Sequence, residues 1–229
     1  MWTKKKDVLV NILFLIMISW LLSGAKSAAS LMCLFVGIFV IITTGLPILK
    51  RNVQLIGVYI FVCVALFAIL QISLNIGELV VFTLGRDATL TGRTDLWAQV
   101  LGMVTNPLMG VGYESFWLGD RMTKLWEKFW WHPNQAHNGY IEIYLNLGLI
   151  GIFLLSGVVW SSYKHTRRTL MFDFDYGRWQ LAFLIITLLI SVTEAVLKGI
   201  SILWFIFLLN AMYVSHMLQP QIQVSSEVY

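Results

Sequence analysis

The residues best suited to chemistry in this sequence lie in one short stretch, residues 135–142. His137, Asn138 and Glu142 stand there, at the start of a long apolar segment. Imidazole is the side chain that most often moves a proton near neutral pH. Polar groups are costly in hydrocarbon, so a group of them at the mouth of an apolar helix is a candidate functional site. Helical spacing adds Tyr140 to the face of His137, and it places Glu142 beside Asn138.

The apolar segment itself predicts a membrane-crossing helix over residues 140–163. In a continuous helix, Tyr144, Gly148 and Gly151 follow His137 along one face. Small residues on a helix face allow a neighbouring helix to approach closely. This face is therefore predicted to look into a helix bundle rather than at lipid.

Arg93 is the second candidate for chemistry. Residues 92–105 are predicted to form a helix with Thr91 as its N-cap and Pro107 just beyond its end. Arg93 falls on the apolar stripe of that helix, next to Trp97, where a solvated arginine is not expected. Two explanations stay open: a bidentate contact to a phosphate near the helix N-terminus, or snorkelling to lipid headgroups.

The composition predicts a membrane protein. Of 229 residues, 58% are hydrophobic and only 12% are charged. The net charge of +4 occurs in short basic groups, which indicates membrane topology rather than nucleic-acid binding. Cys33 and Cys63 lie in apolar segments and are predicted to be buried hydrophobes, not a disulfide or metal pair. No zinc-ligand spacing, P-loop or G-x-G-x-x-G pattern occurs, so neither a metal nor a nucleotide cofactor is expected.

The hydropathy pattern predicts an all-α bundle of about six membrane spans, with one large outer-face loop that contains short amphipathic helices. The expected divisions are residues 1–72 (three spans), 73–137 (a large periplasmic loop), 138–218 (three spans) and 219–229 (a disordered cytoplasmic tail). The basic groups at 4–6, 50–51 and 164–168 are predicted to be cytoplasmic, as are both termini. Lys26 is the exception, because it lies alone in a short outer loop.

Two further features of the outer face are ambiguous in sequence. Glu194 and Lys198 lie four residues apart between the predicted last two spans, 179–192 and 200–217. We expect them to pair with each other, with a substrate contact as the alternative. The large loop also carries an aromatic group that either anchors it at the membrane interface or stacks on sugar rings. Its members are Trp126, Phe129, Trp130 and Trp131, with Lys124 and Lys128 between them.

Three motifs occur in order along the chain. They are SGAKSA at 23–28, GRTDLW at 92–97 followed by NPLMGVG at 106–112, and AHNGY at 136–140 followed by LGLIG at 147–151. Together they resemble the bacterial O-antigen ligase and polysaccharide polymerase superfamily, in particular the polymerases that join exopolysaccharide repeat units. The pair Thr193-Glu194 also resembles a pair near the last outer turn of that family. The likeness extends from about residue 19 to residue 210.

The resemblance implies an inverting, metal-independent glycosyl transferase of the bacterial inner membrane. Such enzymes move a glycan from undecaprenyl diphosphate to a sugar hydroxyl at the periplasmic face. It implies that His137 is the catalytic base and that Arg93 binds the diphosphate. The candidate substrate-binding residues are Lys26, Trp97, Asn138, Tyr140, Glu142 and Glu194. The expected partners are the lipid-linked oligosaccharide, the bilayer and other polysaccharide-assembly membrane proteins, and not nucleic acid.

Two alternatives to a polymerase remain. One is a ligase that transfers finished glycan to lipid A core, which differs only in its acceptor. The other is a non-catalytic lipid-glycan binding or transport subunit, for which broken helices or mid-membrane charges would be expected. Members of the family typically have ten or more spans. The six predicted spans therefore indicate that this chain corresponds to the C-terminal half of such a protein.

Overall fold

The computed structural model describes residues 2–25, 27–62, 92–198 and 201–213, and every regular element in these ranges is helical. The all-α prediction is confirmed for this part of the chain. The elements are α1 (Trp2–Ala25), α2 (Ala28–Thr44), α3 (Pro47–Arg51), η1 (Val53–Leu55), α6 (Arg93–Gly102), α7 (Asp120–Lys128), α8 (Gly139–Phe172), α9 (Phe174–Ile190) and α10 (Ile202–Tyr213). The described ranges do not include residues 63–91 and 214–229. The predicted domain boundaries therefore stay predictions.

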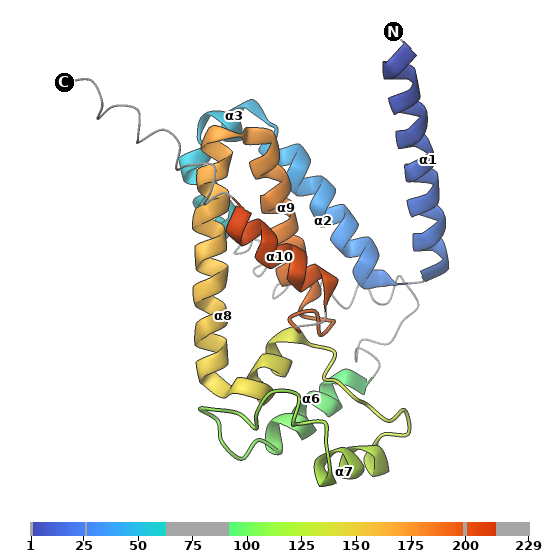
Figure 1. Cartoon of the computed structure of the whole chain (residues 1–229), viewed down its shortest axis with the longest axis vertical. Helices are drawn as coiled ribbons and strands as arrows, with labels where there is room; N and C mark the ends of the chain where they lie inside the picture. Colours follow the sequence, from blue (N-terminus) through green and yellow to red (C-terminus); the bar gives the residue numbers. More distant parts are fainter. Residues whose placement is uncertain (1, 26, 63–91, 199–200, 214–229) are drawn as a thin grey trace, which may run out of the picture.

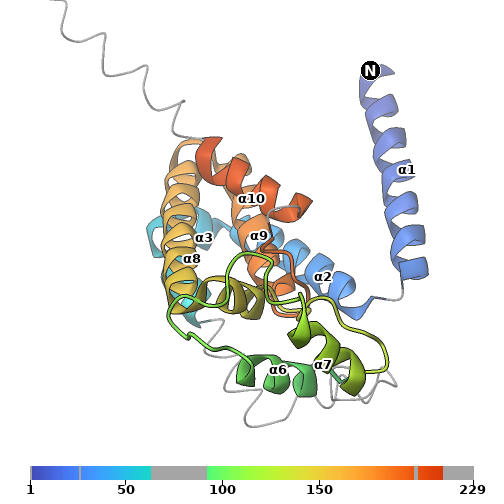
Figure 2. The same ribbon diagram turned by 60° about the horizontal axis from the view of Figure 1, so that its bottom comes forward.

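Helix α9 lies at the centre of a bundle and packs along α2 on one side and α8 on the other (Figure 1). The core between them contains Val40, Ile56, Leu170, Leu181 and Ala182. Helix α1 stands apart from this bundle in both views (Figures 1 and 2). Most of its described side chains are exposed and apolar.

A second core belongs to the large loop. Leu96, Val100, Phe116 and Leu125 are fully buried there, together with Leu145 of α8. Helices α6 and α7 gather around this core at one end of the bundle (Figure 2). The described part of the loop is thus a packed unit with its own hydrophobic interior, which gives it the rigidity to hold side chains in place.

The opposite end of the bundle holds basic residues. The ammonium group of Lys50 lies 5.0 Å from the centre of the Phe174 ring, and the Arg178 guanidinium lies 5.7 Å from it. The turns after α2 and after α8 therefore meet at one end. The helix predicted over residues 140–163 was, however, placed with too early an end: residues 164–168 are helical because α8 continues to Phe172. Asp173 then ends α8 and caps α9 by accepting the N–H of Tyr176 at 3.1 Å.

Among the described residues, α8 is the helix that is both long and apolar enough to cross a membrane. Shorter apolar helical stretches occur at Val8–Gly24, Ala29–Thr44, Val53–Val62 and Ile202–Ala211. The number of six spans stays a prediction, since the third and last predicted spans run partly into undescribed residues. Cys33 is buried, as predicted, and Cys63 lies outside the described residues.

Helix α6 is shorter than predicted, beginning at Arg93 and ending at Gly102 rather than spanning 92–105. Its N-cap is Gly92, with φ of 80° and no side-chain hydrogen bond, and the predicted cap Thr91 lies outside the described residues. A left-handed glycine lets the chain turn sharply into the helix. The turn aims the first helical residue, Arg93, toward α9.

Helix α8 is not the continuous helix that its hydropathy predicts. Gly148 has φ 61° and ψ −152°, a conformation that only glycine adopts readily, and it breaks the helix. Before the break, α8 turns away from the axis of its longer part (Figure 1). The predicted continuous face from His137 to Gly151 is therefore wrong. Gly148 permits a bend in the chain, and its role is not the predicted close packing between two helices.

Candidate functional site

Arg93 reaches across from α6 to the turn between α9 and α10. Leu96 and Val100 are fully buried, and this anchors α6 so that Arg93, on the same side of the helix, points inward. Its Nη1 donates to the carbonyl oxygen of Thr193, and its Nη2 lies 3.4 Å from Oε1 of Glu194. The prediction that Arg93 turns away from solvent is confirmed, since its side chain is 23% exposed.

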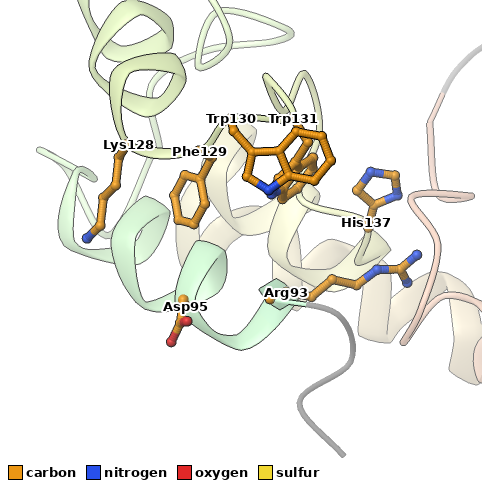
Figure 3. Close-up of a pocket in the computed structure, with 8 residues that line it drawn as sticks. Arg93, Asp95, Lys128, Phe129, Trp130, Trp131 and His137 are labelled. Atoms are coloured by element: carbon orange, nitrogen blue, oxygen red, sulfur yellow. The ribbon is translucent and has the colours of Figure 1, made fainter. Parts of the chain in front are cut away.

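His137 approaches the same carboxylate from the other end of the large loop. It precedes α8 with a φ of 49°, a left-handed conformation that is uncommon for a residue with a side chain. Its Nδ1 lies 3.5 Å from Oε2 of Glu194 and 3.4 Å from the side-chain amide of Gln135. Arg93, His137 and Glu194 thus form a polar trio, contributed by three segments far apart in the sequence. Figure 3 shows Arg93 and His137 side by side.

The turn between α9 and α10 holds the start of α8 through its backbone. Asn138 caps α8 by accepting the N–H groups of Tyr140 and Ile141, while its Nδ2 donates to the carbonyl of Val192 at 3.1 Å. The N–H of Gly139 donates to the Ser191 carbonyl at 2.7 Å. The turn therefore contacts the start of α8, the helix that follows His137. These contacts hold Glu194 beside the imidazole.

Glu142, five residues after His137, is 1% exposed. Its Oε1 accepts the N–H of Ala136 at 2.6 Å, and its Oε2 accepts the indole N–H of Trp117 at 3.2 Å. The ammonium of Lys198 lies 4.0 Å from the same carboxylate. The predicted pairing of Glu194 with Lys198 is therefore wrong. The turn is not helical there, so four-residue spacing does not bring the two together, and each pairs with a different segment.

Two other predicted site residues make contacts that hold the segment in place. The indole N–H of Trp97 donates to the carbonyl of Ala136 at 2.7 Å, which ties α6 to the residue before His137. The hydroxyl of Tyr140 donates to the carbonyl of Leu188 at 2.8 Å, which ties α8 to α9. Lys26 lies outside the described residues. Of the eight candidates, the structure brings Arg93, His137 and Glu194 together and arranges Trp97, Asn138, Tyr140 and Glu142 around them.

A pocket of about 560 Å³ opens beside the trio and is lined by Gly92, Arg93, Asp95, Lys128, Phe129, Trp130, Trp131 and His137 (Figure 3). Trp131 lies 6.0 Å from the His137 ring, centre to centre. Trp130 is 88% exposed, so a broad indole face is open to solvent. The pocket combines a cation, an imidazole and flat aromatic surface.

Sequence reasoning missed how two residues build this site. Trp117 was not among the candidate site residues, yet it is buried and binds Glu142. A buried indole N–H needs an acceptor, which is the signal that could have indicated a buried carboxylate. Thr193 contributes through its backbone carbonyl, which no side-chain pattern reveals.

The chain matches the O-antigen ligase family over residues 11–156, which is more than half of its length. This chain belongs to the O-antigen ligase family. The matched residues include Arg93 and His137, and Glu194 lies beyond them. Together with the long apolar helix α8, membership of this family indicates a bacterial membrane protein.

A curated relative, the exopolysaccharide production protein ExoQ of Rhizobium meliloti (strain 1021), is 34% identical over 139 residues. The alignment covers 58% of this chain and 32% of ExoQ. The chain thus matches about a third of the length of this relative. No solved structure matches the chain.

Proposed function

We propose that this chain forms the catalytic part of a polymerase that joins undecaprenyl-diphosphate-linked oligosaccharide repeat units at the periplasmic face of the inner membrane. The observation that carries the proposal is the convergence of Arg93 and His137 on Glu194 beside an open pocket. Membership of the O-antigen ligase family and the likeness to an exopolysaccharide production protein support it. A ligase would use the same donor chemistry with a different acceptor.

In this proposal His137 is the general base. An ionised carboxylate only accepts hydrogen bonds, so Glu194 favours the tautomer with the proton on Nδ1. Nε2 then carries the lone pair, and it lies on the ring edge away from Glu194. Glu194 also stabilises the imidazolium that forms once the proton has been transferred. A fixed tautomer and a stabilised product charge both suit a general base.

Arg93 stabilises the leaving group. The acceptor hydroxyl attacks the anomeric carbon from the face opposite the diphosphate and passes its proton to Nε2 of His137. The bond from the anomeric carbon to the diphosphate oxygen breaks, and undecaprenyl diphosphate leaves with the electron pair. A guanidinium has five N–H donors, and the contacts to Thr193 and Glu194 use two of them. The others are suited to a phosphate as its negative charge grows.

The test uses Arg93→Ala and His137→Ala in a strain that lacks its own polymerase. Both variants are expected to abolish long-chain polysaccharide on a blot while membrane expression stays normal. Arg93→Lys is expected to keep part of the activity if a point charge suffices, and little if the two-pronged geometry is required. Normal polymer from either alanine variant would remove that residue from the mechanism.

Because the chain matches about a third of ExoQ's length, a second arm measures binding of undecaprenyl diphosphate to the purified chain. Arg93→Ala is expected to weaken this binding and His137→Ala to leave it nearly unchanged, since only the arginine is proposed to hold the diphosphate. Equal affinity of wild type and Arg93→Ala would contradict the donor-binding role. This arm does not depend on whether the chain makes polymer by itself.

A further inference from the structure

The stretch that follows α6, residues 106–112, docks into the break in α8. The N–H groups of Leu149 and Ile150 donate to carbonyls of this docked segment, at 2.9 and 3.1 Å. In return, the segment donates two N–H groups to carbonyls of α8, at 2.9 and 3.0 Å. The four pairs are Leu149 to Pro107, Ile150 to Leu108, Val111 to Leu145 and Gly112 to Asn146. The docked segment thus satisfies backbone groups on both sides of the Gly148 break.

The approach is so close that only glycine fits on either side. A Cβ on Gly148 would lie 2.4 Å from the backbone of Leu108, and one on Gly110 would lie 2.6 Å from the backbone of Asn146. Both glycines have positive φ, at 61° and 70°. The segment and the break are therefore shaped for each other.

The backbone N–H groups of the docked segment are paired within the protein from Leu108 onward. Asn106 accepts the N–H groups of Leu108 and Met109 through its side chain, and that of Gly110 through its carbonyl. With Val111 and Gly112 bound to α8, every N–H from Leu108 to Gly112 has an acceptor within the protein. Water would itself supply acceptors for these donors, whereas hydrocarbon supplies none, so pairing of the N–H groups within the protein is what a segment in hydrocarbon requires.

Two side chains of the docked segment, Leu108 and Met109, are apolar and point outward. Leu108 and Met109 are 60% and 65% exposed, and Leu149 and Ile150, next to them on α8, are about half exposed. Residues 96–113 contain no Asp, Glu, Lys or Arg. The exposed apolar surface of the segment is continuous with that of α8, whose Phe153 and Leu154 are also exposed.

The length of α8 places the break below the membrane surface. The fifteen residues 149–163, between the break and Lys164, rise about 22 Å at roughly 1.5 Å per residue. The hydrocarbon core is about 30 Å thick, and a tilted helix reaches less far. With Lys164 held at the opposite interface by its charge, Gly148 lies about 8 Å inside the hydrocarbon.

We propose that residues 106–112 enter the bilayer with the break in α8, and that Leu108 and Met109 contact lipid acyl chains in the leaflet on the side of the large loop. The segment fixes the depth of α6, which carries Arg93, relative to the bilayer. It does so because it follows α6 and binds α8 at the break, inside the membrane. This inference does not depend on the proposed function.

The experiment places single cysteines at 108 and 109 in a Cys33→Ala, Cys63→Ala background, labels them with a nitroxide and reconstitutes the chain in phospholipid vesicles. Accessibility to oxygen, which concentrates in lipid, is compared with accessibility to a water-soluble nickel chelate. Labels at 108 and 109 are expected to favour oxygen, as a control label at the exposed α8 position Phe153 does. A control label at Thr123, exposed on α7, is expected to favour the nickel chelate.

A second measurement avoids substitution altogether. Vesicles that contain a lipid with a photoreactive group on its acyl chain are irradiated with the unmodified chain, and the adducts are mapped by mass spectrometry. Adducts within 106–112 and their absence from α7 would support the proposal. Labels at 108 and 109 that behave like Thr123, or adducts in α8 without any in 106–112, would overturn it and place the docked segment in water or at the headgroups.

Discussion

Glu194 receives a cation and an imidazole from opposite ends of the large loop. Arg93 contacts one of its oxygens and His137 lies near the other. A carboxylate in that position holds the imidazole in one tautomer and keeps the guanidinium oriented without consuming all of its donors. At the scale of single residues, Glu194 is therefore the group on which the proposed chemistry depends for its geometry.

Glu194→Gln tests this dependence. The amide keeps the size of the side chain but removes the charge, and its NH₂ can face Nδ1 of His137 and favour the wrong tautomer. The initial rate of polymer formation in proteoliposomes is expected to fall about 10²-fold or more, and Glu194→Asp should retain more activity. Glu127→Gln, at an exposed position of α7, is the matched control. A rate equal to that of the control would exclude a role for the charge.

Glu142 has a structural task that a stability measurement reveals. In Glu142→Ala the buried N–H groups of Ala136 and Trp117 both lose their acceptor. Each such loss costs about 1–3 kcal/mol, so the free energy of unfolding is expected to fall by about 2–6 kcal/mol. Denaturation in mixed micelles measures the change. The exposed Glu127→Ala should change it by no more than about 0.5 kcal/mol, and equal effects of the two would show that Glu142 is not an internal support.

Trp130 is the exposed aromatic face at the rim of the pocket, and we expect it to stack on a sugar of the acceptor. Trp130→Ala should raise the acceptor concentration that gives half-maximal rate, and Trp130→Phe should restore most of the loss because a flat ring remains. Trp160→Ala, an exposed indole on the membrane part of α8, is the control. If Trp130→Ala weakens membrane association and leaves the dependence on acceptor unchanged, Trp130 is an interfacial anchor.

At the scale of elements, the break in α8 matters more than any single contact. It separates a short first part, which carries the cap residue Asn138 and the buried Glu142, from the membrane-crossing part. A broken helix was the feature expected of a transport subunit, but here the freed backbone groups are bound by residues 106–112. The break is thus filled by protein, and it connects the loop to the bundle.

Gly148→Ala tests the importance of the break. The added methyl group would meet the Leu108 backbone at 2.4 Å in a backbone conformation that alanine rarely adopts. The strain alone is expected to cost about 1–3 kcal/mol of unfolding free energy, and displacement of residues 106–112 should add protease sensitivity in the loop. Gly157→Ala, in the same helix with open space around it, should be neutral or slightly stabilising. A similar effect at both positions would mean that α8 tolerates straightening.

At the scale of the whole molecule, the candidate site and a group of basic residues lie at opposite ends of the helix bundle. The polar trio and the pocket lie at the end with α6 and α7, and α3 lies at the other end (Figure 1). Lys50 of α3 and Arg178 both contact the Phe174 ring there. Basic residues near a membrane surface favour the cytoplasmic side. We therefore expect the site to face the periplasm, where the proposed donor is presented.

Impermeant maleimide on intact spheroplasts checks this orientation. Single cysteines replace Thr123 on α7 and Asp175 in α9, both exposed, in a chain without Cys33 and Cys63. Thr123→Cys is expected to react at once and Asp175→Cys only after lysis. If the label at Thr123 appeared only after lysis, the loop would be cytoplasmic, and Arg93 and His137 could not meet a donor on the outer face.

The sequence by itself determined the class of the protein and supplied most members of the candidate site. Composition and apolar runs predicted the helical architecture, since burial in lipid and helix formation depend on local residue types. The inward side of Arg93 followed from the spacing of Leu96 and Trp97, and the His137-Asn138 stretch followed from polar residues at the mouth of an apolar helix. These signals depend only on residues that are close together in the sequence, so they can be recognised without the structure.

Only the tertiary structure decided which groups of the site contact one another. Glu194 meets Arg93 and His137 rather than Lys198, because the turn between α9 and α10 is not helical and folds over the start of α8. Glu142 meets Trp117 and Ala136, and Gly148 receives residues 106–112, through contacts between segments tens of residues apart. Such contacts depend on how whole elements pack and on where a backbone can bend. The spacing of residues along the sequence reveals neither the packing of the elements nor the positions of the bends.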